Sequence, residues 1–192
     1  SGVEYANKNY GTKAEIVELP SYAGKDVTDK DVKGNYVGDF NDPTNGKVVG
    51  KALIDEGCDI IFVAAGNSGN GVFTAAKESG GKTKVIGCDV DQYDDGANNA
   101  ENILLTSALK NMRVNVERQL NAIKDGSFKG ENVTLRADTD STGYVKAEGR
   151  QQLAAETIEK LDEVYAKLKD GSIVPASNFN GSTPTDFKGL SD

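Results

Sequence analysis

Residues 57–71 read GCDIIFVAAGNSGNG, an apolar run that leads into a turn rich in glycine and asparagine. The run at 59–64 predicts a buried strand, because β-branched and aromatic residues favour strands. Beyond the turn we expect a helix from about Gly71 to Ser79 and a second strand at 84–88. Strands that alternate with helices in this way indicate βαβ units and a parallel sheet.

The same alternation continues on both sides of this stretch. Asp42 and Pro43 predict a helix start, because aspartate caps the first turn and proline fits the first helical position. The other expected elements are strands at 14–19, 103–106 and 132–136, helices at about 42–56, 109–123 and 150–169, a polar loop at 21–33 and a polar surface tail from 178. Val3, Ala6 and Tyr10 fall at helical spacing, so the sequence opens inside a helix and we expect further residues upstream. This order predicts an α/β fold, an open parallel sheet flanked by helices.

The composition excludes several classes of function. The 192 residues include 30 acidic and 22 basic side chains, and the net charge of −8 repels phosphate backbones, so we expect no nucleic-acid partner. The sequence contains no histidine, which removes His-based catalytic triads and His-ligated metal sites. We therefore predict no catalytic residues, no metal and no enzyme activity. No apolar run approaches the roughly 20 residues needed to cross a bilayer.

The two cysteines lie on neighbouring predicted strands. Cys58 precedes the strand at 59–64, and Cys88 ends the strand at 84–88. If the strands are parallel, the sulfur atoms lie at opposite ends, offset by roughly 13 Å at about 3.3 Å per residue. That separation exceeds the reach of a disulfide. We predict two free, buried thiols.

The turn at 64–71, which is rich in glycine and asparagine, is the first candidate for a binding site. Ligands of open parallel sheets bind beyond the carboxyl ends of the strands, where helix N-termini direct N–H groups outward. A tight turn that needs glycine only for its dihedral angles explains the composition equally well. A Walker A loop is excluded, because Gly71 is followed by Val72 and Phe73 in place of lysine and a hydroxyl residue.

A dinucleotide-binding turn remains as an alternative. Gly69 and Gly71 precede the helix, and Asp89 stands 20 residues beyond Gly69, where a ribose-binding acid belongs. Thr74 occupies the place of the third glycine, and its branched side chain hinders close helix packing. The alternative function is accordingly an NAD-dependent oxidoreductase built on the Gly69 turn.

Three further side chains are candidates for ligand contact. Asp89 ends a predicted strand, and a carboxylate there is suited to accept hydrogen bonds from paired sugar hydroxyls. A calcium loop counted from Asp89 fails, because its sixth and twelfth positions hold Asp94 and Ala100. Lys110 is expected in the first turn of a helix, where the dipole disfavours a cation and a partner is indicated. Phe62 belongs to the core or stacks on a ligand ring.

Five sequence blocks together resemble the basic membrane protein family, the nucleoside-binding lipoproteins of ABC transporters. They are VGDFNDP at 37–43, GCDIIFVAAG at 57–66, GNGVF at 69–73, VIGCDVDQ at 85–92 and LTSALK at 105–110. The blocks occur in the family's order over about residues 1 to 136. The resemblance implies a type I periplasmic-binding-protein fold, in which two Rossmann-like lobes close over a ligand.

The resemblance also implies a ligand site. Phe62 would stack on the nucleobase, and Gly66 and Asn67 would border it. Asp89 and Lys110 would hold the ribose hydroxyls. Asn67 stands where relatives usually have a second glycine, so its amide is expected to influence base preference.

The implied protein is the substrate-binding component of an ABC transporter, which captures adenosine, guanosine or inosine for a membrane permease without a cofactor. It would act outside the cytoplasm at the cell membrane, lipid-anchored in its full-length form. Residues 1–107 and 131–192 would belong to the second lobe. Residues 108–130 would cross to a first lobe that is mostly missing here and lies on another segment or chain. A sensor domain that kept the fold without transport predicts the same binding.

Overall fold

The computed structural model describes residues 1–25, 29–177 and 179–191, which form two compact units. The first, here called the sheet unit, comprises Val17–Lys110 and Tyr144–Leu153. The second, the helical unit, comprises Ser1–Ile16, Asn111–Gly143 and Ala154–Asp192. The sheet unit contains most of the predicted βαβ pattern.

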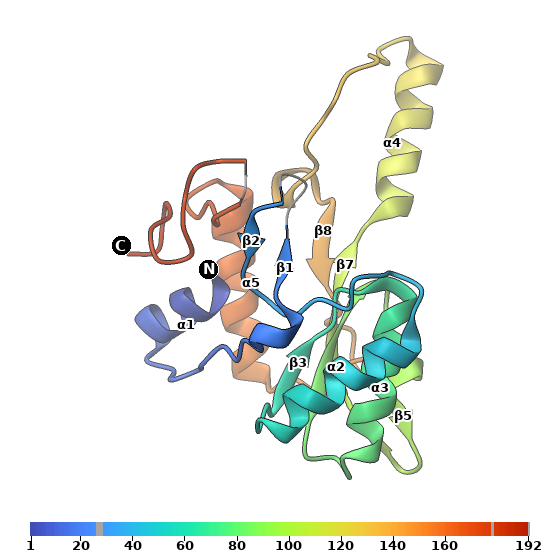
Figure 1. Ribbon diagram of the computed structural model, residues 1–192. Coiled ribbons are helices and arrows are strands. Elements are labelled where there is room, and N and C mark those ends of the chain that lie inside the picture. The colour runs from blue at the N-terminus through green and yellow to red at the C-terminus, as the bar shows by residue number, and fades with distance from the viewer. Residues whose placement is uncertain (26–28, 178, 192) are drawn as a thin grey trace. The chain divides into compact units, whose positions relative to one another are not determined.

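A four-stranded sheet organises the fold, in the order β3–β4–β7–β8 (Figure 1). Its strands are β3 (Ile60–Phe62), β4 (Lys84–Asp89), β7 (Leu104–Lys110) and β8 (Thr142–Tyr144). β3 runs parallel to β4, with Ile61 opposite Val85. β4 runs parallel to β7, with Asp89 opposite Leu109. The predicted α/β class with a mostly parallel sheet is confirmed.

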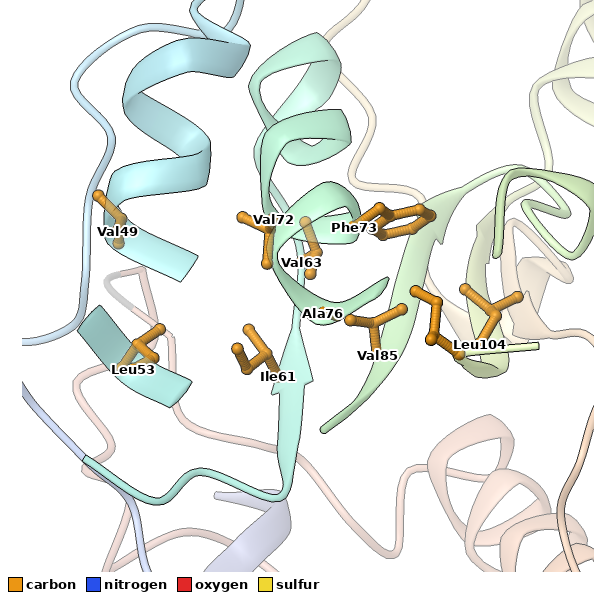
Figure 2. Close-up of a cluster of buried hydrophobic side chains, with 10 residues drawn as sticks. Val49, Leu53, Ile61, Val63, Val72, Phe73, Ala76, Val85 and Leu104 are labelled. Carbon is orange, nitrogen blue, oxygen red and sulfur yellow. The ribbon is translucent and has the colours of Figure 1, made fainter. Parts of the chain in front are cut away.

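Two helices cover one face of this sheet, α2 (Pro43–Asp55) and α3 (Gly69–Glu78). Asp42 caps α2 as predicted, since its carboxylate accepts a hydrogen bond from the Asn45 amide. Figure 2 shows side chains of both helices directed at the strands. The shared core of the helices and the strands consists of Val49, Leu53, Ile61, Val63, Val72, Phe73, Ala76, Val85, Ile103 and Leu104.

Two glycines bring the helices together. A Cβ atom at Gly71 would stand 1.9 Å from the Pro43 carbonyl oxygen, and one at Gly46 would stand 2.0 Å from the Ser68 carbonyl oxygen. Gly69 is also tight, because its Cβ would meet the Val63 side chain at 2.8 Å. Gly69 and Gly71 therefore serve packing within the unit. These contacts account for the glycines on which the dinucleotide-binding alternative depends.

The remaining elements of the sheet unit are short. Three are 3₁₀ turns: η1 (Pro20–Tyr22), η2 (Gly66–Ser68) and η3 (Asp94–Gly96). Four are two-residue strands that form antiparallel pairs. β1 (Gly24–Lys25) pairs with β2 (Asp31–Val32), and β5 (Ala97–Asn98) pairs with β6 (Glu101–Asn102). The strand predicted at 14–19 does not form. The side chain of Asn35 instead bonds the Leu19 amide and the Val17 carbonyl, in place of a neighbouring strand.

The helical unit contains α1 (Gly2–Tyr10), α4 (Met112–Asp125), η4 (Ala137–Thr139) and α5 (Ala155–Lys169). Its core joins both ends of the chain, because Tyr5 packs with Ile173, Phe187 and Leu190. The expectation that the tail from 178 lies only on the surface is therefore wrong for Phe187 and Leu190 (178 itself lies outside the described residues). Those two apolar side chains complete a core that α1 and α5 alone leave open.

Three other expected boundaries are corrected. The helix predicted from 109 begins at Met112, because β7 continues to Lys110. The helix predicted from 150 begins at Ala155, because Gln152 is held by backbone groups of β7. The residues at 132–136 form no strand, and most of their side chains are exposed. Local periodicity does not reveal whether a neighbouring strand is present.

The two thiols are free, as predicted. Cys58 and Cys88 are half-buried, however, so the expectation of full burial is wrong. Burial still raises the pKa of both thiols, with a further rise from the carboxylates of Asp59 and Asp89. Among the described residues, no helix is long and apolar enough to cross a membrane.

Candidate functional site

Parallel strands bring the predicted site residues to one edge of the sheet unit. Phe62, Asp89 and Lys110 are the last residues of β3, β4 and β7. The turn at 66–68 follows β3 directly and leads into α3. The carboxyl ends of parallel strands are where open α/β sheets bind ligands.

Asp89 and Lys110 form an ion pair with 3.1 Å between Oδ1 and Nζ. Both side chains remain about half exposed. An exposed pair of this kind contributes only about 0–1 kcal/mol to folding, so it adds little to stability. What the pair does offer is a carboxylate that accepts hydrogen bonds beside an ammonium that donates them, an arrangement suited to neighbouring hydroxyl groups.

The expectation that Lys110 opens a helix is wrong, because Lys110 is the last residue of β7. The argument from an unfavourable helix dipole therefore does not apply to it. Its place is explained by strand register: Leu109 lies opposite Asp89, so Lys110 extends one position beyond the carboxylate. From there its flexible side chain reaches back to Asp89.

The backbone at Asp89 is strained. Its φ is 70°, and the Val90 amide donates a hydrogen bond to the Cys88 carbonyl at 2.9 Å. A bond across three residues with a positive central φ is a γ-turn of the rare kind. Strained non-glycine conformations cost about 1–3 kcal/mol each and gather at binding and active sites. The Cys88 thiol also faces Asp89, with its Sγ 3.7 Å from Oδ1.

The turn after β3 is held by Ser68, which is fully buried. Its hydroxyl donates to the Asp39 carbonyl at 2.6 Å and accepts from the Asp42 amide at 2.8 Å. Its own amide donates to the Phe40 carbonyl at 3.1 Å. One serine therefore fixes the loop before α2 to the turn before α3. The sequence analysis missed Ser68. Ser68 stands at the N-cap position of α3, but its side chain makes no capping hydrogen bond, so a local capping pattern does not reveal its role.

Gly66 and Asn67 stand at the start of this turn. Gly66 has a φ of 55°, which favours glycine, and a Cβ there would make a tight contact of 3.2 Å with the Phe40 carbonyl oxygen. The amide of Asn67 is held on two sides. Its Nδ2 donates to Asn41 at 2.6 Å, and its Oδ1 accepts from Asn70 at 2.7 Å. One N–H and one acceptor position of Asn67 remain for a ligand.

Phe62 is 57% exposed, so it is not a core residue. Its neighbour Ile61 is buried against α2 and α3, and strand alternation places Phe62 on the opposite face. Register puts Phe62 opposite Ile86, three positions before Asp89. A second exposed aromatic, Phe40 (76%), lies in the loop held by Ser68 and was missed by the sequence analysis. Its only sequence signal is a large apolar residue between polar ones.

Comparison with known proteins identifies the family of this chain. Residues 22–178 match the family model of Bmp, described as ABC transporter substrate-binding protein PnrA-like. This chain belongs to the Bmp family. The Bmp family contains transporter substrate-binding proteins, so the match favours the binding-protein prediction over the oxidoreductase alternative.

Among its relatives, this Bmp chain is 34% identical over 149 residues to a CD4+ T-cell-stimulating antigen of Listeria monocytogenes, with 72% of this chain and 41% of that protein covered. It is 32% identical over 139 residues to the ABC transporter nucleoside-binding protein BmpA of Lactococcus lactis, with 64% and 40% covered. A solved ABC transporter solute-binding protein from Aeropyrum pernix K1 shares the fold, with a TM-score of 0.68, 21% identity, and 94% and 52% covered. The chain thus spans between two fifths and one half of the length of the curated relatives it matches.

On the described part of the chain, two surface hollows are lined by residues of the helical unit. Both are shallow and lie along α4 and the segment after it, one lined by Val114 and Arg118 among others, the second by Phe128 and Val133. The exposed Asp89 and Lys110 pair lies in neither. The edge formed by the carboxyl ends of β3, β4 and β7, here called the carboxyl edge, holds the acceptor, donor and aromatic groups that a polar ligand requires.

Proposed function

We propose that this chain supplies the second lobe of an ABC transporter substrate-binding protein that captures a purine nucleoside. The protein delivers adenosine, guanosine or inosine to a membrane permease, acts outside the cytoplasm and is lipid-anchored at full length. The observation that carries the proposal is the Asp89–Lys110 ion pair at the carboxyl edge of a Bmp-family sheet. A relative named as nucleoside-binding supports the ligand class.

Each side chain has a role in binding, and no bond is broken. The Asp89 carboxylate accepts hydrogen bonds from the ribose hydroxyls while Lys110 donates to them. Phe62 stacks on the base, since every base offers a π-face. Gly66 leaves room for the base, and the free N–H and acceptor of Asn67 contact its edge. The proposed binding of the nucleoside uses no cofactor and no metal.

The lobe assignment is part of the proposal. Residues 1–107 and 131–192 belong to the second lobe, and residues 108–130 cross to the first lobe of the family fold. Two observations support a crossing helix. The chain covers about half of its relatives. None of the residues of α4 is buried, and Leu120 and Ile123 on it are 60% and 59% exposed.

Calorimetric titration of the protein at its full natural length tests the function. We expect saturable binding of at least one purine nucleoside, weakened at least tenfold by Asp89→Ala and by Phe62→Ala. Asp55→Ala is the matched control for Asp89, because Asp55 also forms an exposed ion pair, with Lys51. Ile60→Ala is the control for Phe62, because Ile60 is exposed on the same strand.

The same titration separates the alternatives. Absence of heat and of affinity for every nucleoside would contradict the proposal. Binding of NAD with a change in nicotinamide fluorescence would favour the oxidoreductase. A sensor domain binds the same nucleosides, so association with a permease, measured in membranes that contain it, distinguishes transport from sensing.

A further inference from the structure

Arg150 connects a distant segment to the loop that follows Asp89. Its Nε donates to Asp91 Oδ2 at 2.8 Å. Its two terminal nitrogens donate to the two carboxylate oxygens of Asp94 at 2.7 and 3.0 Å. The guanidinium also lies over the Tyr93 ring, 5.3 Å from its centroid. Bidentate geometry together with ring stacking distinguishes this contact from an isolated surface ion pair.

The backbone around Arg150 is anchored to β7. The Val145 amide donates to the Ser107 carbonyl, and the Thr106 hydroxyl donates to the Val145 carbonyl. Beyond Arg150, the Gln152 amide donates to the Leu105 carbonyl at 2.7 Å. Because the backbone is bonded to β7 both before and after Arg150, the position of the Arg150 side chain relative to the loop is fixed.

The loop in turn determines the conformation of Asp89. The Gln92 side chain accepts a hydrogen bond from the Cys88 amide at 2.9 Å, and the Gln92 amide donates to the buried Ser107 hydroxyl at 3.2 Å. Asp91 Oδ1 accepts from the Tyr93 amide at 2.9 Å. Together these bonds close the chain around the γ-turn at Asp89. A strained turn persists only where its surroundings fix it, and Arg150 contributes to those surroundings from outside the loop, as Ser107 of β7 does.

We propose that Arg150 is a positioning residue, which holds the γ-turn that directs the Asp89 carboxylate toward the ligand. This inference rests on the proposed function for its ligand, a nucleoside. The claim that Arg150 holds the backbone turn at Asp89 does not depend on the ligand. Lysine cannot replace Arg150, because a single ammonium lacks the planar fork that engages both carboxylates.

The test uses the full-length protein and two readouts. The first is the one-bond Cα–Hα coupling of Asp89 by NMR, which distinguishes positive from negative φ and does not require a ligand. The second is calorimetric affinity for adenosine, guanosine and inosine. For Arg150→Gln and Arg150→Lys we expect the coupling to move toward the extended value and the affinity to fall about tenfold.

The matched control is Lys160→Gln. Like Arg150, Lys160 is partly buried, pairs with a carboxylate, Glu156, and lies over a tyrosine ring, Tyr10, but it belongs to α5 of the helical unit. We expect it to change neither readout. If Arg150→Gln fails to fold, Asp94→Asn weakens the same contact and should shift both readouts in the same direction by a smaller amount.

The outcomes separate the two claims. An unchanged Asp89 coupling in Arg150→Gln overturns the inference whatever the ligand does. A changed coupling with unchanged affinity also overturns it, because the turn would then not direct the carboxylate. If the wild-type protein binds no nucleoside, the proposed function fails, and the coupling still decides whether Arg150 holds the turn.

Discussion

Gly71 of α3 lies so close to Pro43 of α2 that a Cβ atom on Gly71 would stand 1.9 Å from the Pro43 carbonyl oxygen. The same atom would stand 2.5 Å from the Lys47 amide nitrogen. Both contacts are with backbone, which cannot rotate away as a side chain can. The helix pair that supports the carboxyl edge therefore requires glycine at this position.

Gly71→Ala should destabilise the sheet unit by about 3 kcal/mol, because α2 and α3 must separate to admit the methyl group. This loss lies at the upper end of the destabilisation that overpacked cores usually show. Denaturant unfolding measures the loss. Gly130→Ala is the control, since nothing lies within 4 Å of a Cβ there. Equal stability of the two variants would contradict the close contact.

Ser68→Ala should cost about 1–3 kcal/mol, because it removes a buried hydroxyl and leaves the Asp42 amide without its partner. The loop that contains Phe40 should also exchange its amide hydrogens faster. Thermal unfolding and hydrogen exchange check both effects. Ser172→Ala, on the surface, is the control. An unchanged melting temperature would show that the hydroxyl does not fix the loop.

The ion pair of Arg150 with Asp91 should persist below the pH at which an ordinary aspartate becomes protonated. The hydrogen bond from Arg150 is the largest cause and lowers the pKa of Asp91. Burial opposes it, and the Tyr93 amide and the charge of Arg150 lower the pKa by smaller amounts. A carboxyl whose pKa falls on folding adds stability above its unfolded pKa, about 3.9, and loses it as the pH drops through the lower folded value.

NMR titration of the Asp91 carboxyl carbon should therefore give a midpoint below the ordinary aspartate range. In Arg150→Gln the pKa of Asp91 should rise toward that range. A midpoint that is the same in both proteins would show that Arg150 does not act on this carboxylate in solution.

The apolar side chains of α4 provide a test of the lobe assignment. Leu120→Ser and Ile123→Ser should change the stability of the 192-residue chain by no more than about 0.5 kcal/mol, because both residues are exposed. In a protein of full family length the same changes should lower the melting temperature and nucleoside affinity, since the first lobe would cover them. Leu104→Ala, in the core, should cost about 2–5 kcal/mol in either form.

An equal effect of the α4 variants in both forms would contradict the proposed crossing. The contrast with Leu104 matters, because it shows that the assay detects a lost core contact when one is present.

The predictions that succeeded depend on short stretches of sequence. Asp42 and Pro43 mark the start of α2 whatever surrounds them, since a cap bonds its own helix. The runs at 59–64 and 84–88 are apolar enough to indicate strands. The expectation that the first strand is buried is wrong for one of its faces, because Ile60 and Phe62 of β3 are 48% and 57% exposed. The predictions that failed, the strands at 14–19 and 132–136, required a partner strand, which local pattern does not encode.

The site shows the same division. Asp89 was found because it ends a predicted strand, and the structure places it at the carboxyl edge beside Lys110. Ser68, Phe40 and Arg150 were missed. The roles of Ser68 and Arg150 depend on contacts with residues 26 to 59 positions away in the chain.

The sequence alone determined the α/β class and the parallel direction of the central strands, because hydrophobic period, caps and glycine turns act over a few residues. The candidate set of Phe62, Gly66, Asn67, Asp89 and Lys110 came from the resemblance of its sequence blocks to the family. Only the tertiary structure decided that Gly69 and Gly71 serve packing, that Lys110 ends a strand and that Arg150 reaches the loop after Asp89. Those facts depend on which distant segments meet in space. Such contacts form only after the whole chain has folded, so a short stretch of sequence does not reveal them.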